Sequence, residues 1–201
     1  MLRCAITDRS TFPGNDDQRI DALVQQAALW SRQGIEIIQL REKDLPTPVL
    51  TTLARRILER TTRSILIVNS SLDAAIAARA HGVHISFKSP AASHIEIVER
   101  YAAAHLPTPI VTVSCHTLSE VQQASATNPD AILFAPVFGK IVANRFVAAP
   151  TGLDALRDAC RLAHPVPVIA LGGVTLGRAR LCLQAGAAGV AGIRLFHNQL
   201  P

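Results

Sequence analysis

Short runs of β-branched and other apolar residues recur along the chain, and each ends on a cluster of polar residues. The runs lie about 25 residues apart, with helix-like stretches between them, which is the spacing expected of repeated βα units. We expect eight strands, at residues 3–7, 35–41, 64–69, 82–85, 109–114, 130–135, 167–171 and 189–193.

The stretches between the runs carry apolar residues at helical spacing. They predict helices at residues 17–32, 48–59, 92–103, 118–126, 153–162 and 177–185. Eight strands with intervening helices, and no linker between them, predict one α/β domain over residues 1–201, a closed TIM (β/α)8 barrel. In such barrels the active site lies at the carboxyl ends of the strands, so polar residues there are functional candidates.

The length of the chain affects the last element of this barrel. The 201 residues are fewer than the roughly 250 typical of the fold. Only residues 194–201 follow the last strand, so we expect the final helix to be short or missing. Part of the barrel wall is then open or covered by a neighbouring subunit, as in a homodimer. The longest irregular piece, residues 137–151, is a candidate active-site loop.

Composition and charge exclude several classes of protein. The net charge of +5 comes from scattered Arg and Lys, and aromatic residues make up only 4%, which disfavours binding to nucleic acid. A mild positive charge fits an anionic small molecule. No apolar run approaches the roughly 18 residues of a membrane span, and no signal peptide is evident, so we expect a cytoplasmic protein. The four cysteines lack metal-binding spacing and are expected to be reduced core residues.

The second expected strand ends in a group of charged residues. Side chains alternate along a strand, so Gln39 and Arg41 share a face, and Lys43 lies just beyond them. Together they form a cationic cup suited to phosphate or carboxylate. In the alternative interpretation, Glu42 and Asp44 neutralise these cations, and the sequence alone does not decide between the two.

Glycines mark the ends of the last two strands. Gly172 and Gly173 follow the seventh strand, and Gly192 with Ile193 closes the eighth. Without a Cβ atom, glycine lets backbone N–H groups approach an anion, and these two loops commonly hold phosphate in TIM barrels. We expect these four residues to bind phosphate; the alternative is that the glycines serve tight turns and close packing.

The fifth strand ends with a candidate for proton transfer. Ser114 and His116 share a face, whereas Cys115 points the opposite way, which disfavours a Cys-His nucleophilic pair. His116 is the catalytic candidate because imidazole exchanges protons near neutral pH, although a lone histidine at a strand end is often structural. Carboxylates are scarce at the strand ends, so a magnesium site is disfavoured.

Several segments together resemble one known family. They are Ala5-Ile6-Thr7-Asp8, Gln39-Leu40-Arg41-Glu42-Lys43, Val68-Asn69, Gly82-Val83-His84, Ser114-Cys115-His116-Thr117, Ala135-Pro136-Val137-Phe138 and Ala170-Leu171-Gly172-Gly173-Val174. In this order, over most of the chain, they resemble the thiamine-phosphate synthase and TenI-type thiazole tautomerase superfamily. The resemblance implies a TIM barrel of thiamine biosynthesis whose partner is a small phosphorylated thiazole. It also implies that Gln39, Arg41, Lys43 and Asn69 line the pocket, while the Gly172–Gly173 turn and the Gly192–Ile193 region hold the thiazole phosphate.

The two branches of this superfamily differ in chemistry. The synthase joins hydroxymethylpyrimidine diphosphate to thiazole phosphate and releases pyrophosphate with the help of Mg²⁺. The tautomerase isomerises a thiazole carboxylate phosphate by proton transfer without a metal. Ser70 and Ser89 stand where the synthase usually has magnesium-binding aspartates, and residues 139–145 replace its threonine-rich loop. Lys140 in that loop is a candidate cation for the substrate.

The missing carboxylates place the tautomerase first in our ranking. We expect His116 to be catalytic, no cofactor to be needed, and Gln39, Arg41, Lys43, Asn69, Ser114 and Lys140 to contact the substrate. The first alternative is a thiamine-phosphate synthase with displaced ligands for Mg²⁺. The second is a non-catalytic protein that binds thiamine precursors or regulates the pathway.

Overall fold

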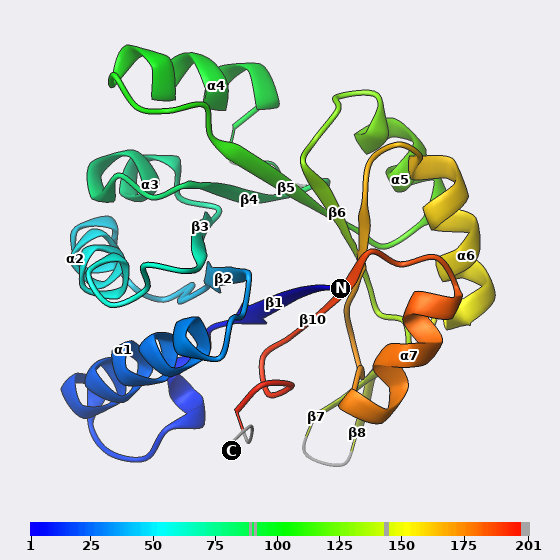
Figure 1. Cartoon of the computed structure of the whole chain (residues 1–201), viewed down its shortest axis with the longest axis horizontal. Coiled ribbons are helices and arrows are strands. Elements are labelled where there is room, and N and C mark those ends of the chain that lie inside the picture. The colour runs from blue at the N-terminus through cyan, green and yellow to red at the C-terminus, as the bar shows by residue number, and fades with distance from the viewer. Residues whose placement is uncertain (89, 91, 143–144, 198–201) are drawn as a thin grey trace.

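Eight parallel strands close into a barrel in the computed structural model of the protein (Figure 1). The structure describes residues 1–88, 90, 92–142 and 145–197, without the side chains of residues 140–148. The strands follow the order β1-β10-β9-β6-β5-β4-β3-β2 around the barrel. Their bounds are β1 (Leu2–Ile6), β2 (Ile37–Leu40), β3 (Ile65–Asn69), β4 (Gly82–Ser86), β5 (Ile110–Cys115), β6 (Ala131–Phe134), β9 (Val168–Ala170) and β10 (Gly189–Gly192). The predicted TIM barrel is confirmed.

Helices surround the barrel (Figure 1). They are α1 (Asp16–Arg32), α2 (Thr47–Leu58), α3 (Leu72–Ala78), α4 (His94–Ala103), α5 (Leu118–Ser125), α6 (Gly152–Ala163) and α7 (Leu176–Gln184). The sequence did not predict α3. This helix has only 7 residues, and its small alanines give a weak apolar pattern. The Ser71 side chain nevertheless caps it by accepting a hydrogen bond from the Ala74 N–H.

Two further segments differ from the prediction. A 3₁₀ helix (Arg9–Thr11) follows β1, and the Asp8 side chain caps it by accepting a hydrogen bond from the Ser10 N–H. The loop expected at residues 137–151 contains an antiparallel pair, β7 (Lys140–Val142) and β8 (Arg145–Ala148). At the other end, no helix follows β10 within residues 193–197, in agreement with the short or missing closing helix.

Alternation along each strand creates two apolar layers. Inward-facing residues such as Cys4, Ile37 and Ile169 fill the barrel, while outward-facing residues such as Ile38 and Leu40 pack with the helices. Burying an aliphatic side chain of this size contributes about 1.5–3 kcal/mol, so the double layer supplies most of the driving force for this fold. The interior is apolar at its base and becomes polar toward the carboxyl ends of β2 to β5.

The segment after β10 packs against α1. The Trp30 indole N–H donates to the Phe196 carbonyl at 3.1 Å, and Phe196 is only 1% exposed. The His197 ring stacks on Phe12 with 5.5 Å between ring centroids. This anchor holds the end of the described chain against the barrel wall.

All four cysteines are free, and Cys4, Cys115 and Cys182 are buried, as expected from their spacing. Among the helices that the structure describes, none is both long and apolar enough to cross a lipid bilayer. The cytoplasmic location stays a prediction.

Candidate active site

Polar side chains from β2 to β5 line one side of the barrel mouth. The Gln39 amide N–H donates to the Asn69 side-chain oxygen at 3.4 Å. The Asn69 amide in turn donates to the Ser70 hydroxyl at 3.1 Å. Ser114 lies on β5, opposite Ser86 of β4 in the strand register. The structure therefore brings together Gln39 and Asn69, two of the predicted substrate-binding residues, and the contact of Ser114 with the same substrate stays a prediction.

His84 lies on β4, opposite Asn69 in the strand register, and is 5% exposed. Its Nδ1 atom lies 2.8 Å from the Thr112 hydroxyl. Burial, and to a smaller extent the positive charge of Arg41, lower the pKa of His84 to about 3. The imidazole is therefore neutral at physiological pH.

The carboxylates beside Arg41 and Lys43 pair with a different cation, Arg9. Arg9 contacts the Glu42 carboxylate at 3.2 Å and the Asp44 carboxylate at 2.6 Å. These hydrogen bonds to Arg9 hold the pKa of Asp44 at about 2. Within the described part of the chain, neither Arg41 nor Lys43 has a carboxylate partner. The interpretation in which Glu42 and Asp44 neutralise these two cations is therefore wrong.

Thr7 fixes the position of Arg41 from the neighbouring strand. Its hydroxyl accepts the Arg41 backbone N–H at 2.8 Å and donates to the Glu42 carboxylate at 2.6 Å. Glu42 also accepts the Arg9 backbone N–H at 3.1 Å. The end of β2 is thus hydrogen-bonded to the end of β1, which holds the cationic cup in place.

The Gly172–Gly173 turn lies on the opposite side of the mouth. Both residues have positive φ, +94° and +64°. The Gly172 carbonyl accepts the Phe138 N–H at 3.0 Å, so the turn is joined to the segment after β6. The two glycine N–H groups donate to no acceptor in the part of the chain that the structure describes. Tight packing and free donors coexist here, so the two interpretations of these glycines do not exclude one another.

The neighbouring Gly192 and Ile193 end β10 beside this turn. Ile193 packs with the apolar barrel interior, and a Cβ on Gly192 would lie 2.9 Å from the Leu195 Cβ. Close packing therefore explains Gly192 at least in part, and its contact with phosphate stays a prediction.

His116 lies exposed at the end of β5. Its Nδ1 atom is 2.8 Å from the Ala135 carbonyl oxygen. Because a carbonyl only accepts, Nδ1 donates in this contact, and Nε2 is the ring nitrogen left to face a substrate. The Glu120 carboxylate accepts the His116 backbone N–H at 2.6 Å and fixes the backbone below the ring. His116 is arranged so that Nε2 can accept a proton.

Three comparisons with known proteins bear on this site. The family model described as thiamine monophosphate synthase matches residues 4–196. The chain belongs to this family. It is 32% identical to "Putative thiamine-phosphate synthase 2" of Aquifex aeolicus, over 96% of this chain and 95% of that protein. It is 34% identical to the thiamine-phosphate synthase of Roseiflexus castenholzii, over 92% of this chain and 76% of that one.

The solved structure of thiamine phosphate pyrophosphorylase from Pyrococcus furiosus has the same fold. It superposes with a TM-score of 0.78 at 25% identity, over 96% of this chain and 85% of that chain. The names of these members of the thiamine monophosphate synthase family favour the coupling transferase over the tautomerase that the sequence placed first.

Magnesium is associated with the coupling reaction, so the family raises the question of a metal site. Magnesium in phosphate-handling sites is held by one or two carboxylates together with the substrate. Here Glu42 and Asp44 are bound by Arg9, Glu120 accepts the His116 N–H, and Asp8 caps the 3₁₀ helix. No group of three or more His, Cys, Asp or Glu side chains that could hold a metal occurs among the described residues. Ser70 and its neighbours therefore do not fit a protein-held magnesium ion, and Ser89 lies outside the described residues.

Some residues of the site were missed or are not described. Arg9, Thr7 and Glu120 were not among the predicted site residues, although Arg9 directly follows the strand-end residue Asp8. Arg9 lies in the loop after β1, and Glu42 and Asp44 lie in the loop after the neighbouring strand β2. A cation and two carboxylates in adjacent loops are a sequence signal for an ion pair between those loops. The Lys140 side chain lies outside the described part of the structure.

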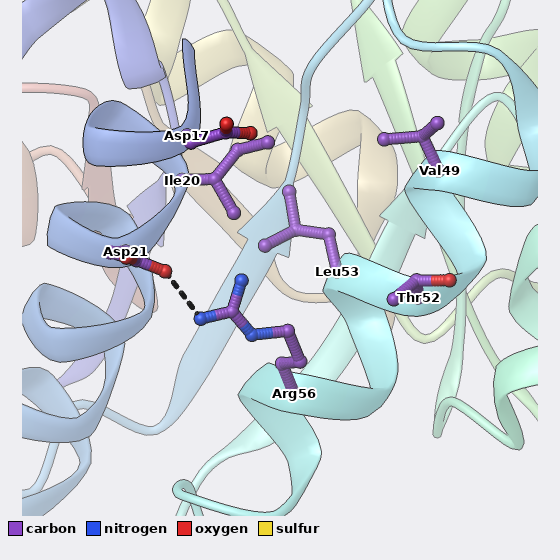
Figure 2. Close-up of a pocket in the computed structure, with 7 residues that line it drawn as sticks. All are labelled: Asp17, Ile20, Asp21, Val49, Thr52, Leu53 and Arg56. Atoms are coloured by element: carbon purple, nitrogen blue, oxygen red, sulfur yellow. Dashed lines mark hydrogen bonds and ion pairs between the residues drawn. The ribbon is translucent and has the colours of Figure 1, made fainter. Parts of the chain in front are cut away.

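A second concave surface lies on the outside of the barrel. Figure 2 shows a groove between α1 and α2, lined by Asp17, Ile20, Asp21, Val49, Thr52, Leu53 and Arg56. Arg56 already pairs with Asp21 at 2.6 Å. This groove is therefore less suited to bind an anionic ligand than the barrel mouth, where Arg41 and Lys43 have no carboxylate partner among the described residues.

Proposed function

We propose that the protein is a thiamine-phosphate synthase, a transferase that joins a pyrimidine diphosphate to a thiazole phosphate and releases pyrophosphate. The observation that carries this proposal is the pairing of Glu42 and Asp44 with Arg9. It leaves two positive charges, Arg41 and Lys43, at a mouth that must receive a diphosphate. The relatives named thiamine-phosphate synthase support the same reaction.

The two sides of the mouth take different roles in this proposal. Gln39 and Asn69 offer amide donors and acceptors to the pyrimidine ring, and Arg41 with Lys43 binds its diphosphate. The N–H groups of Gly172 and Gly173, which have no acceptor among the described residues, hold the thiazole phosphate. The thiazole nitrogen then faces the pyrimidine methylene carbon across the mouth.

In the reaction, the lone pair of the thiazole nitrogen forms the new C–N bond. The C–O bond to the diphosphate breaks, and its electron pair leaves with pyrophosphate. Negative charge develops on the leaving oxygen, and preorganised cations stabilise it in the transition state. Arg41 and Lys43 supply this stabilisation, and no step is assigned to a metal because the described carboxylates do not fit one.

The test is a pyrophosphate-release assay with the purified protein and both substrates. We expect turnover in the wild-type protein and a loss of about 100-fold in kcat/KM for Arg41→Met, the size typical of removing one charge-stabilising group. Arg56→Met is the matched control, because it removes an arginine from the outer groove, and it should keep wild-type activity. Absence of pyrophosphate release from the wild-type protein would contradict the proposal.

A second candidate is the tautomerase, and the geometry of His116 favours it. The unprotonated Nε2 can take a proton from carbon and return it to another ring position, which balances the isomerisation without a co-reactant. The test is conversion of the thiazole carboxylate phosphate in the presence of a chelator. Isomerisation that disappears in His116→Ala would support this candidate, and its absence in the wild-type protein would reject it.

A further inference from the structure

Arg9 holds together the loops that follow β1 and β2. It is 8% exposed, although it belongs to a short 3₁₀ helix at the surface of the mouth. Its guanidinium contacts Glu42 at 3.2 Å, Asp44 at 2.6 Å and, at the start of α1, Asp16 at 3.4 Å. One cation thus faces three carboxylates from two segments of the chain, the loop after β2 and the start of α1.

Two of these carboxylates are neighbours of the substrate cations in the sequence. Glu42 lies between Arg41 and Lys43, and Asp44 follows them directly. Glu42 is only 5% exposed, so its charge is costly unless it is paired. A carboxylate in this position pairs either with Arg9 or with the cations that the substrate needs.

We propose that Arg9 is a positioning residue that binds Glu42 and Asp44 and so keeps Arg41 and Lys43 available to the diphosphate. This inference rests on the proposed function. It adds a residue that acts on the site through its ion pairs with Glu42 and Asp44 and does not contact the substrate itself. Arginine suits the role because its planar group donates to two carboxylates at once, which a lysine cannot do with the same geometry.

Without the Arg9 side chain, Glu42 keeps its hydrogen bonds from the Thr7 hydroxyl and the backbone N–H of residue 9, but the charges of Glu42 and Asp44 lose their cation and attract Arg41 and Lys43 instead. Attraction between unit charges a few ångströms apart is worth about 1 kcal/mol in water and more near a protein surface. The diphosphate then competes with Glu42 for Arg41 and Lys43. Neutralising Glu42 in the same protein removes the buried one of these two competing charges, so the two substitutions are coupled.

The experiment measures binding of inorganic pyrophosphate by calorimetry. Arg9→Met should weaken binding about tenfold, which corresponds to roughly one surface ion pair gained by the competing carboxylates. The double variant Arg9→Met/Glu42→Gln should recover to within about threefold of the wild-type Kd. Arg56→Met is the matched control, because it removes another paired arginine outside the mouth, and it should leave the Kd unchanged.

Folding is checked by thermal melting, because Arg9→Met leaves a buried carboxylate without its partner. If that variant does not fold, Arg9→Lys carries the test, since it keeps the charge but loses the two-sided contact. It should weaken pyrophosphate binding about threefold, and Glu42→Gln should reverse the loss.

The outcomes separate this inference from the proposed function. If the wild-type protein binds no pyrophosphate, both the diphosphate site and the role of Arg9 are overturned. If the wild-type protein binds pyrophosphate and the folded Arg9 variants bind it equally well, only the role of Arg9 is overturned. A loss of binding that Glu42→Gln does not reverse overturns it as well, because the charge of Glu42 is then not the cause of the weaker binding.

Discussion

Gly172→Ala tests whether the turn after β9 requires glycine. An ideal Cβ built on Gly172 lies 2.7 Å from both Cα and Cβ of Pro136. Carbon atoms in normal contact stay about 3.5–4.0 Å apart. The Gly172 φ of +94° is also a conformation that residues with a Cβ rarely adopt. The added methyl group therefore meets both a steric and a conformational obstacle.

The magnitude follows from these two terms. The left-handed conformation costs about 1–2 kcal/mol for a residue with a Cβ, and forcing an extra carbon into a packed site costs about 1–3 kcal/mol. The backbone has little room to relax, because the carbonyls of Leu171 and Gly172 accept hydrogen bonds from Val137 and Phe138. We expect the free energy of unfolding to fall by about 2–5 kcal/mol.

Urea denaturation measures the loss of stability, and calorimetry with thiazole phosphate measures the effect on the site. Binding should weaken, because a shifted turn no longer presents its N–H groups to the phosphate. Gly177→Ala is the matched control, since no heavy atom lies within 4 Å of its Cβ position and it lies in α7. That substitution should be neutral or stabilise by up to about 1 kcal/mol. A Gly172→Ala variant as stable as the wild-type protein, with unchanged binding, would refute the steric argument.

Two further predictions concern stability. The folded pKa of His84 is about 3, below its ordinary value of 6.5, so the unfolded chain binds more protons between these pH values. The contribution of His84 is therefore complete above about pH 6.5 and falls as the pH drops, by at most about 1.4 kcal/mol per pH unit. Urea unfolding at pH 7 and pH 5 should show this slope, and a folded His84→Asn variant that keeps the full slope would contradict it. Trp30→Phe removes the hydrogen bond to the Phe196 carbonyl and should lower the free energy of unfolding by about 1 kcal/mol. The C-terminal end should then be cleaved faster by protease. A variant that resists protease as well as the wild-type protein would count against this anchor.

The barrel could be predicted from the sequence because its signals are local. Each strand is an apolar run that ends on polar residues. That Gln39 and Asn69 lie together followed from the family resemblance, and the structure shows their side chains in contact. The elements that were missed are short. The helix α3 has 7 residues, and β7 and β8 have 3 and 4. Segments of this length are decided by the tertiary contacts around them rather than by their own pattern.

The arrangement of charge at the mouth could not be predicted for a different reason. Arg9 and Glu42 are 33 positions apart, and their contact requires β1 and β2 to be neighbours and the 3₁₀ helix to direct Arg9 back toward β2. The sequence shows Arg41, Glu42, Lys43 and Asp44 in a row, and nearest-neighbour pairing is as plausible there as pairing across the loops. Only the fold selects between them.

This selection also bears on which reaction the site performs. The absence of the expected magnesium carboxylates at Ser70 and Ser89 led from the sequence toward the tautomerase, on the assumption that the leaving diphosphate needs a metal. That assumption depends on how many cations the protein itself offers at the mouth. With Glu42 and Asp44 bound to Arg9, Arg41 and Lys43 have no carboxylate partner among the described residues, and under the proposed function they offset part of the charge of the diphosphate. The sequence alone left open which cation pairs with Glu42 and Asp44. Their pairing with Arg9 is the feature that makes the proposed synthase reaction compatible with a barrel mouth that has few free carboxylates.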